Sequence, residues 1–162
     1  MNTKTFKRIL SSVVIGLVGL IFILFLGTCL NINPIKGLDL KEMNYNGYTA
    51  FFGKGSEFDT SVGSITVLIL LLLVVILSIL NIVFPKISLV FNIFVVIFAL
   101  LASIFIFLGT TDFMVVRYSQ SIDYFNYYCD VNLGWAAIIA GIFGLFIVIA
   151  SIAQEVYAVL KR

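Results

Sequence analysis

The sequence predicts an all-α membrane protein: a bundle of four transmembrane helices with a small extracellular cap, in which short β-strands are allowed for. The chain of 162 residues is 62% hydrophobic and only 11% charged, whereas a soluble domain carries about 25% charged residues. Each of four apolar runs is at least 20 residues long, about the length that a helix needs to cross a ~30 Å hydrocarbon core. The alternating segments of about ten residues that mark a transmembrane β-barrel are missing.

The four apolar runs cover residues 9–30, 64–84, 87–108 and 134–160. The first three contain no Asp, Glu, Lys or Arg. Backbone polar groups in lipid must pair within their own segment, so each run is predicted to be a helix. Pro85 and Lys86 join the second and third runs so closely that these helices must form an antiparallel hairpin. We expect one membrane domain over residues 1–162, with outer loops at 31–63 and 109–133.

The distribution of basic residues predicts the orientation. Six basic residues lie in short segments on one side of the membrane: Lys4, Lys7, Arg8, Lys86, Lys161 and Arg162. The other side carries four, in two long loops that also hold most of the acidic residues. Because Lys and Arg concentrate in cytoplasmic segments, we predict a multi-pass protein of the cell membrane with both termini in the cytoplasm. The basic start also resembles a signal peptide, but no Ala-x-Ala site follows, so an uncleaved anchor is preferred.

The two outer loops are rich in aromatic residues. Such residues either form an interfacial belt and the core of a cap, or provide a surface for a protein partner. Residues 48–52 favour a β-strand by propensity. The residues considered for a partner surface are Tyr45, Tyr48, Phe51, Phe52, Tyr118, Tyr124, Phe125, Tyr127 and Tyr128.

Cys29 and Cys129 are the only cysteines, and both are predicted on the outer side. A disulfide between them would tie the end of the first helix to the second outer loop. The alternative is a pair of free thiols. A third interpretation, lipidation of Cys29, is disfavoured because Thr28 precedes it where a lipoprotein signal has a small residue.

Few polar side chains fall within the apolar runs. Asn81 and Asn92 are placed at similar depth in the hairpin, so their amides are predicted to hydrogen-bond to each other; the alternative is a role as ligands for an ion or a substrate. Glu155 lies near the cytoplasmic end of the fourth run, where pairing with Lys86, Lys161 or Arg162 is preferred over a coupling role in transport.

Small residues recur at helical spacing in the first and fourth runs. They are Gly16, Gly19, Gly134, Ala137, Gly141 and Gly144. Small residues allow helix backbones to approach closely, so the first and fourth helices are predicted to pack together. A homodimer seam on the same residues is the alternative.

The layout resembles a group of small bacterial four-helix membrane proteins of unassigned function. The resemblance is carried by residues 22–27, by Asn46-Gly-Tyr-Thr-Ala-Phe-Phe-Gly53 and by Leu133-Gly-Trp-Ala-Ala through Gly144. The plan is also similar to that of claudins, although their Trp and paired cysteines are missing between the first two helices. The resemblance implies no activity for any residue.

Composition also limits the function classes. The chain has no histidine, which excludes Ser/His and Cys/His couples and histidine zinc sites. It has no basic run for nucleic acid, and Asp112, Asp123 and Asp130 do not fit a metal-binding loop. We therefore expect no catalytic residue, cofactor or metal. The expected function is non-catalytic, through contact with lipid and with another membrane or extracellular protein or a second copy; the alternative is a component of an oligomeric transporter or channel.

Overall fold

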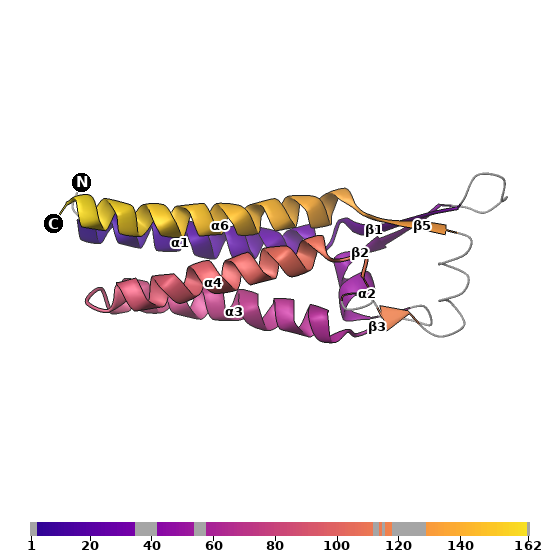
Figure 1. The fold of residues 1–162 in the computed structure, drawn as a ribbon, viewed down its shortest axis with the longest axis horizontal. Helices are drawn as coiled ribbons and strands as arrows, with labels where there is room; N and C mark the ends of the chain where they lie inside the picture. Colours follow the sequence, from indigo (N-terminus) through magenta and orange to yellow (C-terminus); the bar gives the residue numbers. More distant parts are fainter. Residues whose placement is uncertain are drawn as a thin grey trace.

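The structure is a computed structural model that describes residues 3–34, 42–53, 58–111, 114, 116–117 and 129–161. Four helices are long and apolar enough to cross a membrane. They are α1 (Thr3–Leu24), α3 (Val62–Val83), α4 (Ser88–Phe107) and α6 (Trp135–Leu160). They run lengthwise along the molecule, with both termini and the α3–α4 turn at one end and a small sheet at the other (Figure 1). We call these the terminal end and the cap end.

The four helices form a closed ring. Helix α1 packs against α3 and α6, and α4 packs against the same two helices from the other side. In the middle of the ring and toward the cap, most of the buried side chains are aliphatic, with Ser64 and Ser103 as polar exceptions. The aliphatic side chains include Val14, Val18, Ile21, Val67, Leu71, Val74, Val95, Ala99, Ala102, Ile106 and Ile147, all of which are 1% exposed or less. The hairpin predicted for the second and third runs is confirmed, with α3 and α4 joined by four residues, Phe84 to Ile87.

The first helix differs from its prediction at both ends. Helix α1 begins at Thr3 and ends at Leu24, so Lys4, Lys7 and Arg8 belong to the helix itself. The last part of the first run, which was predicted as helix, forms strand β1 (Thr28–Pro34) instead. A short apolar stretch is compatible with a helix or with a buried strand. Here its pairing with two other strands stabilises the strand conformation.

Three strands form the sheet at the cap end, in the order β2-β1-β5. Strand β1 is central, with β2 (Met43–Asn46) and β5 (Cys129–Leu133) antiparallel on either side. The sheet therefore joins the chain just after α1 to the chain just before α6. The short strands that were allowed for in the cap are present.

A short helix, α2 (Gly47–Phe52), follows β2 directly. The strand expected at residues 48–52 is therefore wrong. Asn46 caps the helix, since its side-chain oxygen accepts a hydrogen bond from the backbone N–H of Thr49 at 2.8 Å. Gly53 ends the helix with a φ of 73°, a left-handed conformation that favours glycine. These two local signals outweigh the strand propensity of the aromatic residues between them.

Several contacts fix the cap to the helices. The backbone N–H of Gly47 donates to the carbonyl of Phe25, and that of Gly134 donates to the carbonyl of Cys29, both at 2.8 Å. Ser61, which caps α3, donates its hydroxyl to the carbonyl of Met114 at 2.7 Å. A second small sheet pairs β3 (Phe58–Asp59) with β4 (Val116–Arg117). The cap is thus attached to the ends of several helices.

Candidate functional site

The sheet at the cap end has one polar face, made of Asn and Asp apart from Thr28, which the register pairs with Asn46. Its Asn and Asp residues are Asn31, Asn33, Asn44, Asn46, Asp130 and Asn132, which we call the asparagine face. The register places Asn31 of the central strand opposite Asn44 on one side and opposite Asn132 on the other, so three carboxamides form a row across the sheet. Asn44, Asn132 and Asp130 are exposed. Each carboxamide offers two donors and an acceptor, so the row can form many hydrogen bonds.

The opposite face of the same sheet is apolar. Leu30 and Ile32 on the central strand are fully buried, and Leu30 lies between Tyr45 and Leu133 in the register. Successive side chains on a strand point to opposite faces, so this buried face fixes the direction of the asparagine face. One atom in the asparagine face is left without a partner: the Oδ1 atom of Asn31 is buried and has no hydrogen bond. Such an acceptor costs about 1–3 kcal/mol unless a donor reaches it.

The aromatic residues of the first loop mostly form the core of the cap. Phe51 is 1% exposed and Phe25 is fully buried, with their ring centroids 5.9 Å apart. Tyr48 is 39% exposed, yet its hydroxyl donates to the carbonyl of Phe22 at 3.0 Å. Phe51 is therefore wrong as a contact residue for a partner, because it is inaccessible. Tyr45 and Phe52 are half-buried against the same core.

The aromatic residues proposed in the second loop lie outside the described residues. They are Tyr118, Tyr124, Phe125, Tyr127 and Tyr128.

Cys29 is a free, buried thiol. Strand register places Cys129 opposite Pro34, five positions along β1 from Cys29, which corresponds to about 16 Å at ~3.3 Å per residue. A disulfide needs Cα atoms within about 7 Å, so this register excludes the bridge, and of the two alternatives left open by the sequence the structure shows a free Cys29 thiol. Burial raises the pKa of the Cys29 thiol to about 12, partly offset by a hydrogen bond with the backbone of Gly47. The thiol is therefore neutral and unreactive at ordinary pH.

A polar cluster closes the terminal end of the bundle. Lys7 of α1 reaches across the ring and donates to Ser88 at the start of α4 at 2.6 Å. The same ammonium pairs with the carboxylate of Glu155 in α6 at 3.2 Å. The side chains of Lys7 and Glu155 are only 14% and 19% exposed. Glu155 thus pairs with Lys7, and the predicted pairing with Lys86 or Lys161 is wrong, while Arg162 lies outside the described residues.

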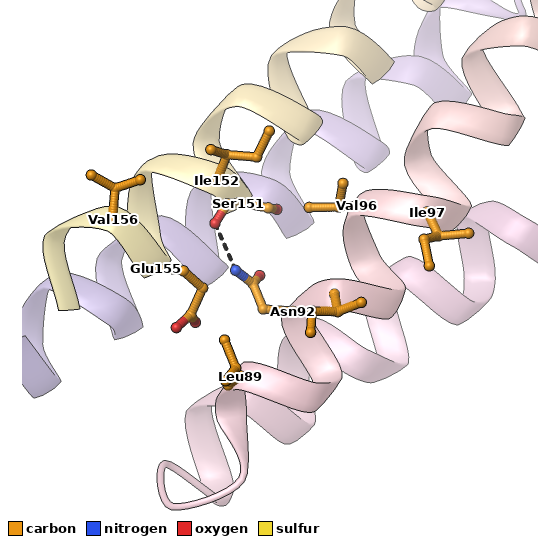
Figure 2. Close-up of a pocket in the computed structure, with 9 residues that line it drawn as sticks. Leu89, Asn92, Val96, Ile97, Ser151, Ile152, Glu155 and Val156 are labelled. Carbon is orange, nitrogen blue, oxygen red and sulfur yellow. Dashed lines mark hydrogen bonds between the residues drawn. The ribbon is translucent and has the colours of Figure 1, made fainter. Parts of the chain in front are cut away.

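More buried polar groups lie one to two turns deeper. The Ser11 hydroxyl donates to Gln154 Oε1 at 3.4 Å, and the Asn92 amide donates to the carbonyl of Ser151 at 2.6 Å (Figure 2). The predicted pairing of Asn81 with Asn92 is wrong, because Asn92 bonds to α6 and the Asn81 Oδ1 atom has no partner. Ser151 Oγ and Gln154 Nε2 are also buried without a partner. This region holds unused hydrogen-bonding capacity.

The small residues of α6 face α4. A Cβ added at Gly144 would clash with the Ser103 Oγ atom, and one at Gly141 would lie 2.6 Å from the Phe107 ring. Ala137 is fully buried. A Cβ added at Gly16 or Gly19 would meet nothing within 4 Å. The first and fourth helices do pack together, as predicted, but their contact does not depend on Gly16 or Gly19.

Sequence reasoning missed both polar sites. The asparagine face appears in the sequence as three alternating triplets, Asn31-Ile-Asn33, Asn44-Tyr-Asn46 and Asp130-Val-Asn132. This period of two is the signal that could have predicted three strands with one polar face. The signal for the polar cluster at the terminal end was weaker. Most of its members are serines, and serine is common at packing positions in membrane helices; they are Ser11, Ser88 and Ser151, together with Lys7.

Among the described residues, no three His, Cys, Asp or Glu side chains gather as a metal site. Comparisons of this chain with protein-family models, with curated proteins and with solved structures found no match. Its function therefore has to be inferred from the geometry of the cap and of the helix bundle.

Proposed function

We propose that this chain is a non-catalytic membrane protein that crosses the bilayer four times and binds another protein through the asparagine face of its cap. One observation carries the proposal: six of the seven side chains that the register places on the polar side of the three strands are Asn or Asp, and Thr28 is the seventh. Propensity works against such a choice, because Asn and Asp are depleted in strands. Solubility alone would be served by Lys, Thr or Glu.

The shape and chemistry of this face suit a protein partner. Small-molecule sites are concave and mostly apolar, whereas a three-stranded sheet presents a broad, shallow face about 10 Å wide at ~4.8 Å between strands. Carboxamides match the donors and acceptors of a peptide backbone. The partner is another membrane or extracellular protein, or a second copy of this chain.

The proposed placement in the membrane follows from charge. Among the described residues, the terminal end carries Lys4, Lys7, Arg8, Lys86 and Lys161. The positive-inside rule then puts the termini in the cytoplasm of a cell membrane and the cap outside. The outward sides of the helices are covered with Ile, Leu, Val and Phe, as contact with lipid requires.

A photo-crosslinking experiment tests the proposal. A benzophenone amino acid at Asn132 is expected to give one discrete adduct in native membranes, and Asn44→Arg in the same chain is expected to remove it. The matched control is Thr111→Arg, an exposed position outside the three strands. An adduct of twice the monomer mass would identify a second copy as the partner. If the adduct persists with Asn44→Arg, or disappears equally with Thr111→Arg, the asparagine face is not the binding surface.

Transport by an oligomer is the second candidate, and the unpaired polar atoms of Asn81, Ser151 and Gln154 favour it. Buried polar groups of this kind often hold water. Against it, the side chains of α1 that point into the ring from Val14 through Ile21 are aliphatic, and the buried Ser103 hydroxyl donates to the carbonyl of Ala99 within its own helix. Among the described residues of the four long helices, the unpaired polar atoms therefore stay near the terminal end. A flux assay with purified protein in liposomes separates the two candidates: solute or ion flux above empty liposomes would favour transport, and none is expected.

A further inference from the structure

We propose that the terminal end holds an anionic phospholipid, with its phosphate in a basic pocket and an acyl chain in a groove between α4 and α6. This inference rests on the proposed membrane placement, and it is independent of any protein partner at the cap. Two hollows at the terminal end carry it.

The first hollow is a pocket of about 300 Å³ at the base of the ring. It is lined by Thr3, Lys4, Lys7, Pro85, Ala158 and Lys161. These residues come from α1, from the α3–α4 turn and from the end of α6, so the pocket exists only in the folded bundle. Three lysines converge on it. Basic pockets between helices on the cytoplasmic side are the kind of site that binds anionic lipid headgroups.

The second hollow is a groove, also of about 300 Å³, between α4 and α6. Val96 and Ile97 of α4 line one side of it, and Ile152 and Val156 of α6 line the other (Figure 2). Ile93 of α4 also lines it. These side chains are aliphatic, and most of them are exposed on the outside of the bundle. The groove can therefore bind an apolar chain and is open towards the bilayer.

The Lys7–Glu155 pair links the two hollows. Lys7 lines the basic pocket and Glu155 lines the groove, and the two side chains lie 3.2 Å apart. Glu155 is the acidic group at this junction, and Lys7 balances its charge. Lys4 and Lys161 also line the pocket, and both side chains are exposed at the terminal end. A charged headgroup at the surface with a chain running inward along the helices is the arrangement of a phospholipid.

Native mass spectrometry of the intact protein, released from detergent with phosphatidylglycerol or phosphatidylcholine, tests the proposal. The wild type is expected to retain phosphatidylglycerol preferentially. The double variant Lys4→Gln/Lys161→Gln should weaken that retention about tenfold or more, since each lysine near an anionic lipid contributes on the order of 1 kcal/mol. The matched control Arg8→Gln/Lys86→Gln removes the same charge at the same end but outside the pocket, and should change retention less than twofold.

The groove is tested separately. Val96→Phe fills it and should lower retention of both lipids, whereas Leu100→Phe, one turn along α4 and outside the groove, should not. Equal losses in the two charge variants would show a diffuse surface effect and overturn the site. Displacement of phosphatidylglycerol by an equal concentration of inorganic phosphate would show a site for free phosphate, and would overturn the lipid assignment. Either result leaves the crosslink at the cap unaffected.

Discussion

The two ends of the helix bundle are built on different principles. At the cap end, Phe25 contacts Phe22, Tyr48, Phe51 and Phe52 with ring centroids 5.9–6.3 Å apart. At the terminal end, an ion pair and several amides and hydroxyls occupy the interior, and some of their polar atoms have no partner. Dense aromatic packing gives one rigid arrangement, whereas a partly satisfied polar cluster is where water or a ligand enters. The cap end therefore presents a fixed surface, and the terminal end has room for an occupant.

The largest expected effect is at the aromatic core of the cap. Phe51→Ala removes a fully buried ring, and should lower the stability of the cap by about 3–5 kcal/mol. The measurement is alkylation of Cys29 in a Cys129→Ser background, since Cys29 lies under α2 and becomes reactive only when the cap opens. Tyr48→Phe removes only one hydrogen bond, worth about 0.5–1.5 kcal/mol. Equal alkylation rates for the two variants would contradict the picture of a cap packed around Phe25.

The ion pair at the other end gives the next effect. Lys7→Met leaves the largely buried Glu155 carboxylate without its cation, and should lower the free energy of unfolding in detergent by about 2–4 kcal/mol. Adding Glu155→Gln should recover most of the loss. Lys86→Met, at an exposed position, is the control and should have an effect within about 0.5 kcal/mol. Failure of the double variant to recover stability would mean that Lys7 acts through contacts other than Glu155.

Alanine substitutions at glycines of α6 and of α1 should change stability by a smaller amount and differently from each other. Gly144→Ala places a methyl group against Ser103, and should lower stability by about 1–3 kcal/mol. Ser103→Gly in the same chain should relieve the clash. Gly16→Ala meets nothing within 4 Å, and is expected to be neutral or to stabilise α1 by up to about 1 kcal/mol. Loss of stability with Gly16→Ala in detergent would instead indicate that a second copy packs on that face.

The smallest effect is a pH dependence at Cys29. Its pKa is about 12 when folded and 9.0 in its ordinary state, so the neutral thiol favours the folded protein. Its contribution to the free energy of unfolding is complete below pH 9 and is lost as the pH rises from 9 towards 12. The part already lost at pH 10 is about 1 kcal/mol. Comparison of wild type with Cys29→Ala between pH 8 and pH 10 measures it, because other groups titrate equally in both. Parallel stability curves would show that the thiol is solvated in the folded protein.

The four long helices could be predicted from sequence because the length and charge of an apolar run are local properties. The end of the first helix could not, since Thr28 to Leu30 is apolar enough for either a helix or a buried strand. The asparagine face depends on Asn31 pairing with Asn132, about a hundred positions away. The Lys7–Glu155 pair was missed because the first helix was predicted to begin at residue 9. Helix α1 begins at Thr3, which places Lys7 within the helix that packs against α6.

The central strand has a consequence for how the molecule is made. Strand β1 emerges from the ribosome early, but its partner β5 follows only after the middle two helices have been synthesised. Contacts of such high sequence separation form late in folding. The sheet is therefore completed only when the start of α6 has emerged, and translation arrested before residue 129 would leave β1 with one neighbour instead of two.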